Sequence, residues 1–87
     1  MASAQSPTPA DDQRARVHFQ AGSQYYDDGR YEEAIPEFRE AYRLSHRNEM
    51  LLNLANAAEH ALQPAAAAEA LETYLTVVPN APDRDAL

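Results

Sequence analysis

Histidine and carboxylate side chains are the groups in this chain whose chemistry could serve catalysis or metal binding. The three histidines, His18, His46 and His60, are scattered, and no two have the i, i+4 spacing of a helical metal site. The acidic pairs Asp27-Asp28 and Glu32-Glu33 flank a predicted turn, where they satisfy helix ends rather than form an acid–base couple. No glycine-rich phosphate loop or Ser/Thr nucleophile motif is present. We therefore expect no catalysis, no cofactor and no metal.

Amide side chains offer a different chemistry, the recognition of peptide backbone. Asn53, Asn56 and His60 have i, i+3, i+7 spacing, so they form one polar strip along a helix. Amide groups in such a strip can hydrogen-bond an extended peptide. The alternative is that these side chains are simply solvated.

Composition limits the partners and the compartment. The 87 residues carry a net charge of −7, which argues against nucleic acid and anionic membranes as partners. No apolar run is long enough to span a bilayer. There is no Cys, so neither disulfides nor thiolate metal sites are expected. All seven basic residues are Arg, a usage typical of a GC-rich genome, and we expect a bacterial protein.

A block of residues recurs at a fixed offset of 33 and predicts how the helices are organised. A repeat of this period is typical of stacked helix hairpins, which present a surface and rarely catalyse reactions. The matched pairs are Gly22 with Ala55, Ala34 with Ala67, Phe38 with Leu71, Ala41 with Tyr74, Leu44 with Val77, and His46 with Pro79.

Apolar spacing and end signals predict an all-α fold. We expect helices at about 12–28, 31–44, 49–62 and 64–78, and the start of a further, truncated or capping helix at 81–87. Asp11 and Asp12 would begin the first helix, Gly29 would end it and Asn48 would cap the third. Val17 belongs to the predicted apolar stripe of the first helix, and Pro36 falls in the first turns of the second.

Residues 1–11 are rich in small residues and proline, so we expect a flexible tail. The small residues Ala2-Ser3-Ala4 either belong to that tail or are the remnant of a cleaved export signal. The compartment stays open accordingly, cytoplasmic or periplasmic.

The spacing of these residues resembles the tetratricopeptide repeat, a hairpin of two helices called A and B. Residues of about 15–47 form the first copy and 48–80 the second. The first copy carries the motif Gly22-x-x-Tyr25-Tyr26-x-x-Gly29-x-Tyr31-x-x-Ala34-Ile35-x-x-Phe38-x-x-Ala41. The second carries Leu51-x-x-Leu54-Ala55-x-x-Ala58, then Ala67-x-x-x-Leu71-x-x-Tyr74, and closes with Pro79.

The resemblance implies an α-solenoid of two hairpins that binds a protein or peptide on the concave face made by the A helices. Carried over by position, the residues of that face are Arg16, Phe19, Gln20, Ser23, Asp27, Glu49, Leu52, Asn53, Asn56 and His60. The best-known peptide site of the family clamps a C-terminal carboxylate with basic residues and Asn. Only Asn53 matches that site, since Phe19 and Ser23 stand where it places Lys and Asn, so we exclude such a clamp.

Departures from the repeat pattern make further predictions. His18 occupies the position of a bulky aromatic residue, and Leu62 replaces the turn glycine, where a positive φ would be strained. Gly22 is expected to lie against the second helix, close to Ala34, because small residues let helices approach.

Three functions follow from this sequence. The leading one is a protein-interaction module, and the alternatives are a self-assembling scaffold and a non-catalytic domain of a larger protein. Self-assembly as a homodimer would use an apolar stripe left partly bare on the last helix, formed by Leu71, Tyr74, Leu75 and Val78.

Overall fold

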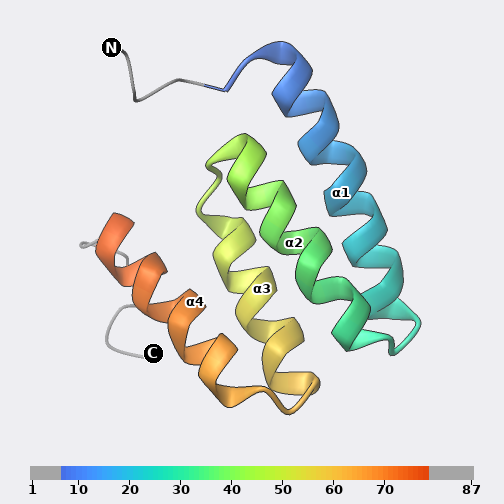
Figure 1. The fold of residues 1–87 in the computed structure, drawn as a ribbon, viewed down its shortest axis with the longest axis vertical. Coiled ribbons are helices and arrows are strands. Elements are labelled where there is room, and N and C mark those ends of the chain that lie inside the picture. The colour runs from blue at the N-terminus through green and yellow to red at the C-terminus, as the bar shows by residue number, and fades with distance from the viewer. Residues whose placement is uncertain (1–6, 79–87) are drawn as a thin grey trace.

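The computed structural model describes residues 7–78, and within them every regular element is a helix. The four helices are α1 (Pro9–Asp27), α2 (Tyr31–Ser45), α3 (Glu49–His60) and α4 (Pro64–Val77). Each helix runs antiparallel to the one before it and packs mainly against its neighbours in sequence (Figure 1). The result is the predicted pair of helix hairpins, α1–α2 and α3–α4. The expected helix at 81–87 and the residues Ala2-Ser3-Ala4 lie outside the described part of the chain.

Helix α1 begins earlier than the acidic residues suggest. Thr8 is its N-cap, and Pro9 stands in the first turn, where a missing N–H has no cost. The Asp11 N–H donates to Thr8 Oγ1 (3.0 Å), and the Thr8 N–H donates to Asp11 Oδ2 (3.5 Å). This reciprocal capping box makes residues 9–11 part of the helix, so the expected start at Asp12 was wrong.

Small residues set the spacing between helices. Ala34 of α2 and Ala57 and Ala58 of α3 are fully buried, in one core cluster with Ile35 and Phe38. Gly22 lies against α2, as predicted, and the residues nearest to it there are Phe38 and Glu37. One packing expectation was wrong. Val17 is 56% exposed, and Ala15 provides the buried surface of that part of α1 instead.

Two further local expectations hold in position but differ in their hydrogen bonds. Asn48 is the N-cap residue of α3, but its side chain makes no capping hydrogen bond, and its backbone is helical. Its carbonyl accepts from the Leu51 N–H (2.9 Å), so a tight turn opens the helix. Pro36 is the sixth residue of α2, beyond the first turn, where its ring nitrogen leaves the Glu32 carbonyl without the usual helical bond.

The turns that close α1 and α3 have the same hydrogen bonds at equivalent positions. In the first, the Gly29 and Arg30 N–H groups donate to the carbonyls of Tyr26 and Tyr25. In the second, the Leu62 and Gln63 N–H groups donate to the carbonyls of Glu59 and Ala58. This is the Schellman motif, which needs a left-handed residue after the cap. Gly29 has φ +77° and Leu62 has φ +61°, so this turn does require a positive φ at the position where Leu62 replaces glycine.

Candidate functional site

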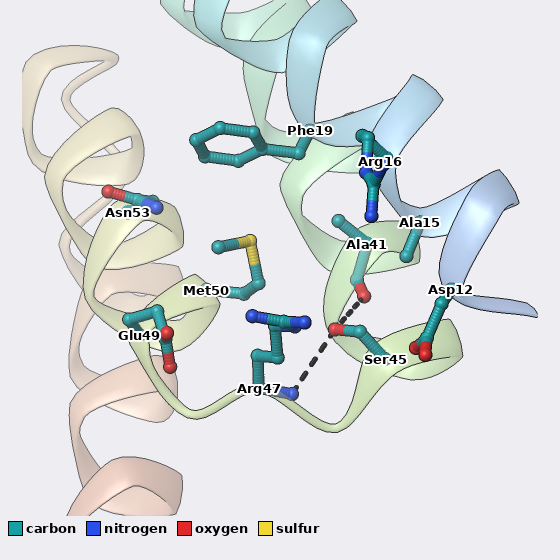
Figure 2. Close-up of a pocket in the computed structure, with 10 residues that line it drawn as sticks. All are labelled: Asp12, Ala15, Arg16, Phe19, Ala41, Ser45, Arg47, Glu49, Met50 and Asn53. Atoms are coloured by element: carbon teal, nitrogen blue, oxygen red, sulfur yellow. Dashed lines mark hydrogen bonds between the residues drawn. The ribbon is translucent and has the colours of Figure 1, made fainter. Parts of the chain in front are cut away.

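A hollow lies between α1 and α3, the A helices of the two hairpins, and its floor is helix α2. Its wider part, which we call the arginine pocket, has a volume of about 350 Å³ (Figure 2). The lining residues are Asp12, Ala15, Arg16 and Phe19 from α1, Ala41 and Ser45 from α2, Arg47 from the following loop, and Glu49, Met50 and Asn53 from α3.

A second hollow of about 190 Å³, the asparagine pocket, continues along the same two helices. It shares Phe19 and Asn53 with the arginine pocket, so the two pockets adjoin, and we call them together the α1–α3 groove. The asparagine pocket is lined by Phe19, Ser23, Tyr26, Asp27, Phe38, Asn53 and Asn56.

The end of α2 positions one wall of the arginine pocket. The buried Ser45 hydroxyl donates to the Ala41 carbonyl (2.7 Å) and accepts from the Arg47 N–H (3.2 Å). His46 then adopts left-handed backbone angles, with φ +56°, which end the helix and reverse the chain. The guanidinium of Arg47 is thereby placed across the pocket from α1, where Arg16 lies (Figure 2).

Part of the pocket lining is apolar. Ala15, Ala41 and Met50 are buried, and Phe19 is 36% exposed, with its ring centre 6.1 Å from that of Phe38. In Figure 2 the ring of Phe19 extends from α1 toward Asn53 on α3. Phe19 therefore offers an accessible aromatic surface where the two pockets meet.

Among the described residues, the two arginines that line the pocket, Arg16 and Arg47, have no acidic side chain paired with them. Within residues 7–78, the side chains of Arg16 and Arg47 form no ion pair or hydrogen bond, whereas Arg14, Arg30 and Arg43 each pair with an acid three residues away on the same helix. Asp12 and Glu49 also line the pocket, and neither lies within ion-pair distance of these guanidiniums.

The structure brings together most of the residues that the sequence assigned to a concave face. Arg16, Phe19, Ser23, Asp27, Glu49, Asn53 and Asn56 all line the groove. Gln20 is exposed on α1 but lines neither pocket, and Leu52 packs against the cluster of Leu51 and Tyr74 instead.

His60 belongs to a ring cluster at the end of the groove. Its ring centre lies 5.4 Å from that of Tyr26 and 4.8 Å from that of Tyr31, so three helices meet there. Nδ1 of His60 lies 2.9 Å from the Asn56 carbonyl and 3.3 Å from the Tyr26 hydroxyl. Because a carbonyl only accepts, this contact assigns the proton to Nδ1, with both oxygens as acceptors. Sequence spacing placed His60 on the polar strip and missed this contact with α1 and α2.

Two other sequence expectations have a specific outcome. Nδ1 of His18 lies 2.7 Å from Oε1 of Glu37, so this position links α1 to α2 by a polar contact in place of aromatic packing.

In the proposed dimer stripe, Tyr74 is only 8% exposed and packs on Leu51, which removes it from an exposed surface. Leu71, Leu75 and Val78 are half-buried, and their role in self-association stays a prediction.

The helices described here also bear on the membrane question. None of those within residues 7–78 is both long and apolar enough to cross a bilayer.

Comparison with known proteins identifies the first hairpin. Residues 15–48 match the family model of the tetratricopeptide repeat, a range that runs from Ala15 in α1 to Asn48 before α3. No curated protein and no solved structure matches the chain. Tetratricopeptide repeats are in general modules for protein–protein interaction. The matched segment, residues 15–48, is thus similar to one tetratricopeptide repeat, and α3–α4 is a second antiparallel helix hairpin beside it.

Proposed function

We propose that this protein is a non-catalytic interaction module that binds an extended peptide segment of a partner protein in the α1–α3 groove. The observation that carries this proposal is the junction of two pockets at Phe19 and Asn53, on the A helices of both hairpins. From Arg16 to Asp27 the groove follows three turns of α1, about 16 Å. An extended peptide of roughly five residues spans that length.

The lining groups suit backbone recognition. Ser23, Asn53 and Asn56 provide neutral donors and acceptors in the asparagine pocket, and such groups can pair with peptide N–H and carbonyl groups. Phe19 provides the aromatic surface on which an apolar side chain of the peptide can pack.

The experiment begins with a peptide selected from a random heptapeptide library displayed within a loop of a carrier protein. Its dissociation constant is then measured by fluorescence anisotropy for the wild type and for the double variant Asn53→Ala/Asn56→Ala. We expect the double variant to bind several-fold more weakly while its circular dichroism is unchanged.

The matched control is Gln20→Ala. The sequence assigned Gln20 to the concave face, but Gln20 lines neither pocket, so this variant removes an amide from outside the groove. It should bind like the wild type. Equal affinity of the wild type and the double variant would assign binding to another face and contradict the proposal.

A further inference from the structure

The arginine pocket holds the two cations of the groove, and they have no acidic partner of their own. Of the arginines within residues 7–78, Arg16, Arg39 and Arg47 make no ion pair, and two of these three line this one pocket. Their guanidiniums come from opposite walls, one from α1 and one from the loop before α3 (Figure 2). Guanidinium groups pair well with carboxylates, so two of them lining one pocket favour a carboxylate as the bound group.

The surrounding charges limit how much negative charge the pocket accepts. Asp12 and Glu49 line the same pocket, so its formal charge is balanced, and the whole chain carries −7. A run of acidic residues would be repelled by this field, whereas one carboxylate between two guanidiniums gains local contacts. The charge pattern therefore favours a segment with a single, isolated acid.

The apolar lining adds a second requirement. Met50 and Ala15 are buried residues of the pocket lining, and Phe19 lies on the side toward Asn53 (Figure 2). In an extended peptide, side chains two positions apart point the same way and lie about 7 Å apart. One apolar side chain can thus contact this surface while the side chain two positions away reaches the guanidiniums.

The ends of the pocket favour an acid within the peptide over a chain terminus. On α1 the lining extends a full turn beyond Arg16, to Asp12, and in the other direction it joins the asparagine pocket. The peptide backbone can therefore continue on both sides of the two arginines.

We propose that the arginine pocket binds the side chain of an internal Glu or Asp that stands two positions from an apolar residue in an extended partner segment. This inference rests on the proposed function of the groove. Arg16 and Arg47 bind the carboxylate, Phe19 and Met50 contact the apolar side chain, and Asn53 and Asn56 bind the backbone.

The test uses the displayed heptapeptide library, whose members have no free termini. We expect selection on the full chain to enrich an acid two positions from an apolar residue. One enriched peptide is synthesised with acetylated and amidated ends, together with a form in which Gln replaces the acid, and a third with a free C-terminal carboxylate. Binding to the wild type and to Arg16→Gln, Arg47→Gln and Arg39→Gln is measured by anisotropy.

Arg16→Gln and Arg47→Gln should each weaken binding roughly threefold to tenfold, and the peptide with Gln should lose a similar factor. That peptide should no longer distinguish the variants from the wild type, because both changes remove the same contact. Arg39→Gln, which alters an unpaired arginine outside the pocket, should have no effect. High salt should weaken the acidic peptide more than the Gln peptide.

Three results would overturn the inference. Enriched peptides without an acid, or equal affinity of the acidic and Gln peptides, would remove the carboxylate site. Tighter binding that requires the free C-terminus would assign the arginines to a chain end. In each case a loss of affinity in Asn53→Ala/Asn56→Ala would leave the groove as the binding site, whereas no loss would show that the proposed function itself fails.

Discussion

At Gly22, α1 lies close against α2. A Cβ atom at this position would lie 2.8 Å from Cε1 of Phe38 and 3.2 Å from Cβ of Glu37, both closer than normal contacts. Phe38 is 3% exposed and lies in the core cluster, so its ring has little room to move. The absence of a side chain at Gly22 is therefore a condition for the packing of the first hairpin.

We expect Gly22→Leu to destabilise the protein by about 1–3 kcal/mol, because the core must expand to accept the new side chain. Urea unfolding followed by circular dichroism measures the change. Gln20→Leu, at an exposed position of the same helix, is the control and should change stability little. An unaltered unfolding midpoint for Gly22→Leu would contradict the close approach of the two helices.

The carboxyl group of Asp11 has a lowered pKa. The larger cause is the hydrogen bond from Arg14 Nη2 (2.6 Å), followed by the bond from the Thr8 N–H. A lowered pKa means that the folded state favours the ionised form. The stabilisation is thus present above the ordinary pKa of an aspartate and is lost as the pH falls through the folded-state value.

We expect Arg14→Gln to raise the pKa of Asp11 toward its ordinary value. A carbon-13 NMR titration of the Asp11 carboxyl group measures the shift directly. Arg39→Gln, at an exposed site outside the capping box, should leave the titration unchanged. If Arg14→Gln also leaves it unchanged, the ion pair does not form in solution.

At the scale of elements, the two Schellman turns show the same backbone with different residues at the left-handed position. Gly29 suits its turn, whereas Leu62 is 86% exposed and holds φ +61° with no packing that offsets the strain. The left-handed conformation costs a non-glycine residue about 1–2 kcal/mol. Glycine would lose more backbone entropy on folding, by about 0.5–1 kcal/mol.

The difference predicts that Leu62→Gly stabilises the protein by roughly 0.5–1 kcal/mol. Leu62→Ala separates the two contributions, because it removes the exposed side chain and keeps the strained backbone. It should not stabilise. Chemical denaturation of both variants checks this, and a glycine variant less stable than the wild type would contradict the strain at this turn.

The elements also show what a sequence of this kind can predict. The bounds of α2 and α4 agree with expectation to within one residue, because Gly29, Pro64 and the apolar spacing are local signals. The start of α1 was missed because Pro9 reads as a tail residue unless Thr8 and Asp11 are recognised as a capping box. The groove residues on α1 and α3 could be named from the repeat, but Leu52 and His60 could not be placed, since spacing along one helix does not say which neighbour each side chain contacts.

The whole molecule is a linear array in which inner and outer helices differ in their surroundings. Helices α2 and α3 each pack against two neighbours (Figure 1). Among the described helices, α1 packs mainly against α2 alone, and α4 packs mainly against α3 alone. Arrays of this kind have stability that varies along the chain.

Hydrogen exchange followed by mass spectrometry should therefore show the slowest amides in α2 and α3 and faster ones in α1 and α4. Exchange at one uniform rate across all four helices would instead indicate that the two hairpins open only as a single unit.

Self-association remains a prediction for the whole molecule. Val77 is 43% exposed beside the half-buried Val78 on α4, and the net charge of −7 opposes pairing of two copies. We expect a weak dimer at high micromolar concentration that salt strengthens by screening this charge. Light scattering measures the mass for the wild type and for Val77→Glu, with Val17→Glu, a second exposed valine on α1, as the control. A monomer at every concentration and salt level would contradict the dimer.

The floor of the arginine pocket comes from α2, while its walls belong to both hairpins. A ligand seated there contacts both hairpins at once, so it binds only while the two hairpins are folded and packed together. By mass action, a ligand at ten times its dissociation constant adds about 1.4 kcal/mol to the free energy of unfolding. A bound ligand therefore raises the melting temperature of the protein, and this rise reports binding. A thermal scan against mixtures of peptides can find the partner segment before anything else about the partner is known.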